Sequence, residues 1–160
     1  MGVDEAVISR VVMLLGGQRE VILAEAARFL ECSHLSSYEK AGPRVTAERL
    51  GHLYDLVITA VHDRRLDAVV AHAEEVARER YAAGYDLSEV QRAYNVLEEA
   101  IWNHLLASVA PEQMATALGL VSTVLGAGKD RLAQEYVSLA SQSKAPSLDL
   151  SALFSGPQRF

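Results

Sequence analysis

The stretch TAERLGHLYDLVITAV, residues 46–61, is the clearest fold signal in the chain. Its apolar side chains recur three and four positions apart, and they are Leu50, Leu53, Tyr54, Val57, Ile58 and Val61. That spacing places them on one face of an α-helix. Thr46 stands where an N-cap is expected, because its hydroxyl can accept a hydrogen bond from a backbone N–H of the first turn. The stretch therefore predicts a helix that buries one face.

The same helical period continues on both sides of this stretch, and no strand pattern stands out. Glycine pairs, single glycines and prolines divide the chain into about six helices. They are predicted at Asp4–Leu15, at about 18–33, from Thr46, between the break near His62-Asp63 and Gly84, from a capping box at Asp86 and Glu89, and from Pro111 to about Ala140. Residues 36–43 are expected to form a loop. The fold class is therefore all-α, with globin-like or bundle packing both left open.

Two details of this pattern can be tested directly. The second helix has an expected apolar stripe of Val21, Ile22, Phe29 and Cys32, interrupted by Glu25. The last helix contains Gly126 and Gly128, and each costs about 1 kcal/mol relative to alanine inside a helix. A local kink or a close contact with another helix would explain both glycines.

The character of the chain changes at Ser141. Residues 141–147, SQSKAPS, are polar and predict a linker, and the apolar motif LDLSALF follows at 148–154. We therefore divide the chain into a helical regulatory domain, residues 1–140, and a linker with an extended apolar tail, residues 141–160. The tail residues that could bind a partner are Leu148, Leu150, Leu153 and Phe154.

Composition limits the possible functions. The 160 residues are 50% hydrophobic and have a formal net charge of −6. This size fits one folded domain, and the acidic balance argues against nucleic acid as a partner. Cys32 is the sole cysteine, Asp4 and Glu5 stand where a signal peptide would be basic, and no apolar run is long enough for a membrane span. We expect a cytoplasmic protein that does not bind membranes.

The segment Gly126-Ala127-Gly128-Lys129-Asp130 resembles a phosphate-binding loop but lacks two of its requirements. Thr123 stands where the loop needs its first glycine, and Asp130 replaces the serine or threonine that would bind magnesium. No strand precedes it. A helix containing glycines and a solvated lysine is the simpler interpretation.

Glu31 and His34 form one Glu-x-x-His motif, the spacing that directs both ligands toward iron in helical bundles. A di-iron site needs two such motifs and two more glutamates, so one chain supplies half a site and only a dimer could complete it. The alternative is a solvated helix end. Nothing in the spacing selects a haem ligand among the five histidines, residues 34, 52, 62, 72 and 104, so no cofactor is predicted.

Other candidate residues fit structural roles better. Cys32 is expected to be a buried structural cysteine, because no residue nearby in the sequence is placed to activate it. Trp102 and the tyrosines 54, 81, 94 and 136 are expected to pack in the core, although they could also line a cavity for a small apolar ligand. The absence of a recognisable catalytic motif predicts that the protein is not an enzyme.

The stretch RERYAAGYDLSEVQRAY, residues 78–94, joins an arginine-bearing helix, a glycine turn and a Glu-Val-x-x-Ala-Tyr helix. It resembles the N-terminal domain of RsbT co-antagonist (RsbR-type) stressosome proteins, and Tyr38 with its following proline loop also suits that family. The similarity covers roughly residues 5–140. It implies a dimeric, all-helical, globin-like module without haem that senses or transmits signals and has no catalytic residues. With no output domain in this chain, the output would pass through an unknown protein partner.

The tail permits an alternative. Residues 147–153 resemble the C-terminal targeting peptides of encapsulin cargo proteins, which dock in an extended form. A tail that folds back on its own domain, or on the partner in a dimer, is the competing interpretation. Two hypotheses follow: a regulatory, homodimeric protein-binding module, and a metal- or small-ligand-binding helical protein that is shell cargo.

Overall fold

The computed structural model describes residues 3–144, and in this range the chain is helical with no strands. The all-α prediction is confirmed. Residues 3–144 form seven helices: α1 (Val3–Gly17), α2 (Arg19–Cys32), α3 (Ser36–Ala41), α4 (Pro43–Asp63), α5 (Asp67–Ala82), α6 (Leu87–Ser108) and α7 (Pro111–Lys144).

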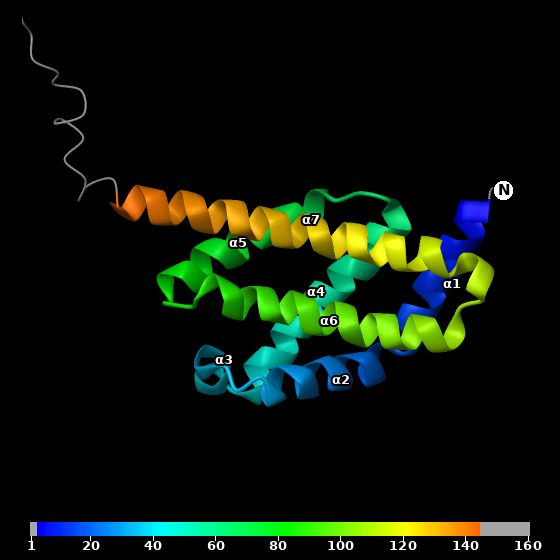
Figure 1. Cartoon of the computed structure of the whole chain (residues 1–160), viewed down its shortest axis with the longest axis horizontal. Helices are drawn as coiled ribbons and strands as arrows, with labels where there is room; N and C mark the ends of the chain where they lie inside the picture. Colours follow the sequence, from blue (N-terminus) through cyan, green and yellow to red (C-terminus); the bar gives the residue numbers. More distant parts are fainter. Residues whose placement is uncertain (1–2, 145–160) are drawn as a thin grey trace, which may run out of the picture.

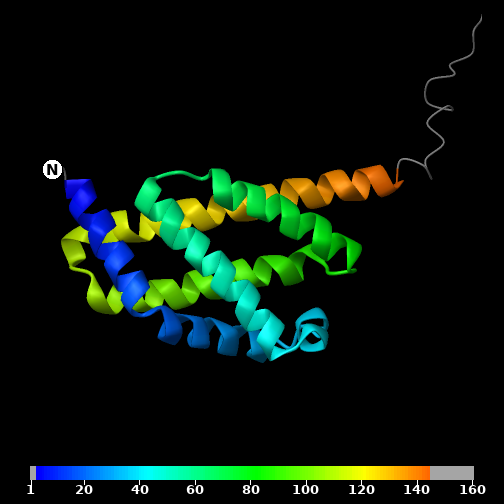
Figure 2. The same ribbon diagram turned by 180° about the vertical axis from the view of Figure 1, so that it is seen from behind.

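The longest helices, α6 and α7, run side by side in opposite directions, joined by a short turn before Pro111 (Figure 1). Helix α5 packs against α7, and α2 packs against the opposite side of α6. Helix α4 crosses behind them at an oblique angle, which is clearest from behind (Figure 2). The packing therefore departs from a simple bundle of near-parallel helices.

The hydrophobic core runs through all seven helices. Its largest fully buried side chains include Tyr54 of α4, Leu97 and Ile101 of α6, and Leu125 and Leu132 of α7. The Tyr54 hydroxyl donates a hydrogen bond to the carbonyl oxygen of Leu15, 2.6 Å away. This bond joins the centre of α4 to the end of α1.

Some helix ends agree with the sequence and others do not. The capping box of α6 forms as predicted between Asp86 and Glu89, and α7 begins at Pro111. The N-cap prediction at Thr46 is wrong, because α4 begins three residues earlier at Pro43, after Gly42 with φ 88°. Proline suits the first helical turn, and glycine adopts the positive φ that leads into it. Thr46 is instead buried within α4.

The predicted loop over residues 36–43 contains helix α3. This helix has six residues, too few for a periodic apolar pattern, which is why sequence periodicity did not predict it. Its buried Tyr38 contacts Tyr85 edge-on, with ring centroids 5.7 Å apart. The extra helix raises the number from the expected six to seven.

The two ends of the described range also differ from expectation. Helix α1 includes Gly16 and Gly17, and α2 begins at Arg19, directly after Gln18. Helix α7 continues to Lys144, so residues 141–144 are helical rather than the start of a linker. The tail residues Leu148, Leu150, Leu153 and Phe154 lie outside the described residues.

Candidate functional site

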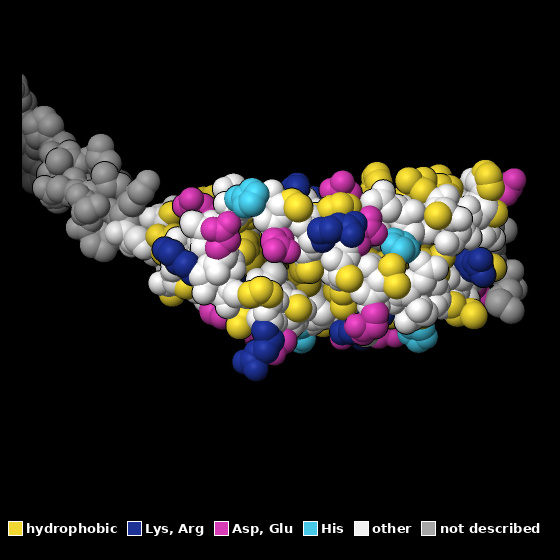
Figure 3. All heavy atoms as spheres, turned by 90° about the horizontal axis from the view of Figure 1, so that it is seen from below, with side chains coloured by type: hydrophobic (Ala, Val, Ile, Leu, Met, Phe, Trp, Pro, Cys, Tyr) yellow, Lys and Arg dark blue, Asp and Glu magenta, His cyan; other side chains and the backbone are white. Residues whose placement is uncertain are grey.

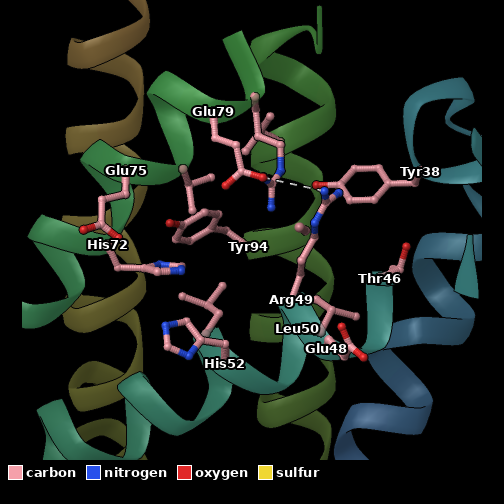
Figure 4. A pocket seen from close by; sticks show the side chains of 15 residues that line it. Tyr38, Thr46, Glu48, Arg49, Leu50, His52, His72, Glu75, Glu79 and Tyr94 are labelled. Carbon is pink, nitrogen blue, oxygen red and sulfur yellow. Dashed lines mark ion pairs between the residues drawn. The ribbon is translucent and has the colours of Figure 1, made fainter. Parts of the chain in front are cut away.

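A cavity of about 350 Å³ lies between α4, α5 and α6, with Tyr38 of α3 at one end (Figure 4). Its apolar wall includes Leu50 and Leu53 of α4, Val76 of α5 and Val90 of α6. The stretch that carries the resemblance, residues 78–94, supplies much of the remaining wall, including Arg80 and Tyr94. A cavity of this volume lies near the lower end of the range of small-molecule sites, about 300–1,000 Å³.

Four residues that line the cavity each have a buried polar atom with no hydrogen-bond partner within residues 3–144. The atoms are Thr46 Oγ1, His72 Nδ1, Arg80 Nη1 and the Tyr94 hydroxyl. Thr46, Arg80 and Tyr94 are only 8%, 6% and 2% exposed. Arg80 Nη1 is ion-paired with Glu79, which leaves the atoms of Thr46, His72 and Tyr94 without any polar partner in the described residues. Buried polar groups in folded proteins are nearly always paired, so these three atoms call for an explanation.

The Arg80 guanidinium has two partners beside the cavity. Its Nη1 forms an ion pair with the Glu79 carboxylate at 2.6 Å. The guanidinium also lies over the Tyr85 ring, 5.7 Å from its centroid. Arg49 approaches the same tyrosine and donates a hydrogen bond to its hydroxyl at 2.9 Å. These contacts fix two cations at the cavity wall.

Two histidines meet at the other end of the cavity. The rings of His52 and His72 are 4.8 Å apart, and the Tyr94 hydroxyl points toward His72 (Figure 4). Burial lowers the pKa of His72, and the nearby His52 lowers it further. Burial also raises the pKa of Tyr94 to about 12, against the opposing effect of Arg80. Near pH 7 the cavity therefore presents a neutral imidazole and a protonated phenol.

The predicted metal ligands do not lie in this cavity. Glu31 is exposed at the end of α2, and His34 follows in a left-handed conformation with φ 50° and pairs with Glu39 at 3.5 Å. Among residues 3–144 no group of three or more metal-binding side chains gathers anywhere. Cys32 is exposed, so the prediction of a buried cysteine is wrong.

The remaining sequence candidates have structural contacts. Lys129, from the segment that resembled a phosphate loop, donates a hydrogen bond to the Asn95 side chain at 3.0 Å. The tyrosines 54, 94 and 136 are buried as predicted, whereas Tyr81 and Trp102 are only partly buried. Tyr94 is the one of these aromatic residues that lines the cavity between α4, α5 and α6.

A second surface feature lies on another face of α6. Asn95, Glu98, Trp102 and Leu106 recur three and four residues apart, so they share one stripe of the helix, which we call the α6 outer face. Leu106 is 56% exposed. The buried Trp102 indole nitrogen has no hydrogen-bond partner in the part of the chain that the structure describes.

The surface charge is mixed. In the space-filling view of Figure 3, basic side chains lie dispersed among acidic and hydrophobic ones rather than in one patch. No helix within residues 3–144 has the length and hydrophobicity needed to span a membrane.

Comparison with known families gives one match. The model of the family described as RsbT co-antagonist protein rsbRD N-terminal domain matches residues 37–142, more than half of the chain. The matched range begins in α3 and includes every helix that lines the cavity. No curated protein and no solved structure matches the chain.

Proposed function

This chain belongs to the family of RsbT co-antagonist N-terminal domains, a regulatory stressosome-type sensor family, and we propose that it acts without catalysis by contacting other proteins. We further propose that it works as a homodimer. The family match supports the first of the two sequence hypotheses and lends nothing to the alternative of a metal-binding shell cargo. The contact surface in this proposal is the α6 outer face.

One observation supports that assignment. Trp102 and Leu106 are one helical turn apart on the α6 outer face, and polar residues Asn95 and Glu98 flank them. Protein interfaces concentrate their binding energy in tryptophan and other large side chains surrounded by a polar rim. The large Trp102 side chain is only partly buried, so part of it is available to a partner.

The test is the oligomeric state of the full chain, measured by light scattering during size-exclusion chromatography. We expect the wild-type protein to elute as a dimer and Leu106→Glu to elute as a monomer, because the substitution places a charge at the centre of the apolar contact. Val137→Glu is the matched control, since Val137 is 63% exposed on α7, far along that helix from its turn with α6. It should remain dimeric.

Two results would contradict the proposal. A wild-type protein that stays monomeric at high micromolar concentration rules out the homodimer. A Leu106→Glu variant that stays dimeric places the contact elsewhere on the surface.

A further inference from the structure

An apolar groove opens where α2 ends, beside α3 and the start of α4. Its volume is about 270 Å³, and we call it the α3 groove. Its apolar wall consists of Ala27, Leu30, Leu35, Tyr38 and Pro43. Ala27 and Leu35 are half-buried and Pro43 is exposed, so part of this wall is open to solvent. An open apolar surface of this kind is typical of a site that another segment or protein covers.

Two other openings in the same part of the molecule are more polar. The cavity between α4, α5 and α6 has three exposed carboxylates, those of Glu48, Glu75 and Glu79. The space between α3 and the turn from α5 to α6 is lined mainly by polar and charged residues, among them Lys40 and Asp86. Of these three openings within residues 3–144, the α3 groove fits an apolar occupant best.

A series of side-chain contacts leads from the end of α7 to this groove. The Tyr81 hydroxyl donates a hydrogen bond to Ser143 Oγ at 3.1 Å, and the Tyr81 ring meets the Tyr136 ring edge-on, with centroids 5.6 Å apart. The Tyr136 hydroxyl donates to the Tyr85 carbonyl oxygen at 3.1 Å, and the Tyr85 ring lies 5.7 Å from that of Tyr38 in the groove. Both ribbon views show the end of α7 and helix α3 toward the same end of the molecule (Figures 1 and 2).

The segment that follows α7 has the composition and the length to fill this groove. Residues 148–154, LDLSALF, contain four large apolar side chains, those of Leu148, Leu150, Leu153 and Phe154. Phe154 is ten residues beyond Lys144, the last residue of α7, and a chain of that length can reach about 33–36 Å. This reach is about the full length of the 22-residue helix α6, roughly 33 Å. The segment is therefore long enough to reach a groove at its own end of the molecule.

We propose that the α3 groove binds residues 148–154 of the same chain. Burying these side chains against Leu30, Leu35 and Tyr38 removes apolar surface of both partners from water, and the connection through α7 holds the segment near the groove. A protein partner of this segment must then compete with the groove for it. The contact is separate from the α6 outer face, so either proposal can fail while the other stands.

The sole cysteine of the chain provides the first test. Cys32 is exposed at the end of α2, next to Glu31 of the groove, so a nitroxide label attached to it places an unpaired electron beside the proposed site. In the full labelled chain, the amide NMR signals of residues 148–154 should lose most of their intensity and regain it when the nitroxide is reduced. Signals that keep their intensity would overturn the proposal.

A control label tests the position of the contact. Cys32→Ser combined with Met13→Cys moves the nitroxide to a residue of α1 that is 73% exposed and precedes the opposite end of α2. The signals of residues 148–154 should then remain strong. Equal loss of intensity from both label positions would mean that the segment makes no specific contact with the groove.

A mixed sample tests which chain supplies the segment. Isotope-enriched Cys32→Ser chain, which cannot be labelled, is mixed with labelled chain of natural isotope abundance. The enriched signals of residues 148–154 should remain strong. If they lose their intensity in this mixture, the groove binds the segment of a second copy and the contact within one chain is refuted.

Substitutions in the segment test its chemistry and leave the helical core untouched. Leu150→Asp combined with Leu153→Asp places two charges against the apolar wall, so the signals of the Cys32-labelled variant should stay strong while its helical circular dichroism is unchanged. Ser155→Asp is the matched control, because it adds a charge just beyond the apolar segment. It should show the wild-type loss of intensity. A loss that persists in the double variant would refute the apolar contact.

Discussion

Gly126 and Gly128 of α7 provide a test of how tightly the cavity wall is packed. A Cβ atom added at Gly126 would meet nothing within 4 Å. A Cβ atom added at Gly128 would lie 2.8 Å from Cε1 of Tyr94 and 3.1 Å from Cγ1 of Val69. Gly128 therefore marks a close contact of α7 with α6 and α5, one of the two explanations that the sequence allowed. We predict opposite effects of alanine at the two positions.

The magnitudes follow from two opposing contributions. Replacing glycine by alanine inside a helix gains about 1 kcal/mol, so Gly126→Ala should stabilise the protein by about that amount. Gly128→Ala has the same gain but must displace the Tyr94 ring, which is 2% exposed and has little room to move. Overpacking a core costs about 1–3 kcal/mol. The net effect at Gly128 should lie between about zero and 2 kcal/mol of destabilisation.

Urea unfolding followed by circular dichroism measures both variants on the same scale. The difference between the two free energies of unfolding isolates the packing cost, because the helix-propensity gain is common to both. We expect Gly126→Ala to exceed Gly128→Ala in stability by about 1–3 kcal/mol, with equal m-values. Equal stabilities would show that α7 does not press on Tyr94 and would refute the packing argument.

Three further predictions concern single interactions. Tyr54→Phe removes the hydrogen bond to the Leu15 carbonyl and should lower the free energy of unfolding by about 1 kcal/mol in a urea titration. Asp86→Ala removes the capping box of α6 and should cost about 1 kcal/mol, with a lower thermal midpoint. The pKa of His72 is lowered in the folded state, so below about pH 6.5 the unfolded chain binds a proton that the folded chain does not. The free energy of unfolding should therefore fall as the pH drops through this range. Between pH 7.5 and 5.5 it should fall less steeply in His72→Gln than in the wild type. Equal slopes would exclude His72 as the cause.

The helices that the sequence predicts best have buried apolar residues at helical spacing and a capping signal that marks their first turn. Helix α6 has both, since Asp86 and Glu89 fix its beginning and Val90, Leu97 and Ile101 lie on its buried face. Helix α3 has neither, because it is too short for a period and its Leu35 N-cap offers no side-chain hydrogen bond. Local signals can place a helix only when the segment itself contains them.

Helix α2 shows a different kind of error. The expected stripe included Val21 and Cys32, but the buried residues are Ile22, Ala26 and Leu30. Val21 is 60% exposed, and Cys32 is also exposed. The large apolar residues indicated the wrong buried face. The face that is buried includes the small Ala26, which lies four positions from both Ile22 and Leu30. Residue size misled the assignment, although the helix itself was predicted.

The cavity could not be predicted from the sequence, because its polar residues come from separate helices. His52 and His72 belong to α4 and α5 and become neighbours only when these helices pack. Arg80 is 6% exposed, although arginine is normally a surface residue. The resemblance stretch included Arg80 and Tyr94 but gave no indication that both line one space. This site depends on contacts between helices, and the spacing of residues along the chain does not reveal such contacts.

Helix α6 connects the cavity to the proposed contact surface. Tyr94 lines the cavity, and its neighbour Asn95 begins the α6 outer face, so α6 contributes both to the cavity wall and to the proposed contact surface. Tyr94 also touches the position of Gly128 in α7, so a displacement of its ring by a ligand must be absorbed by α6 or α7. Interiors are too densely packed to absorb such a shift locally. By thermodynamic linkage, any ligand of this cavity that changes the affinity of the dimer has its own affinity changed by dimerisation by the same factor. A signal could thus pass through this domain without any catalytic step.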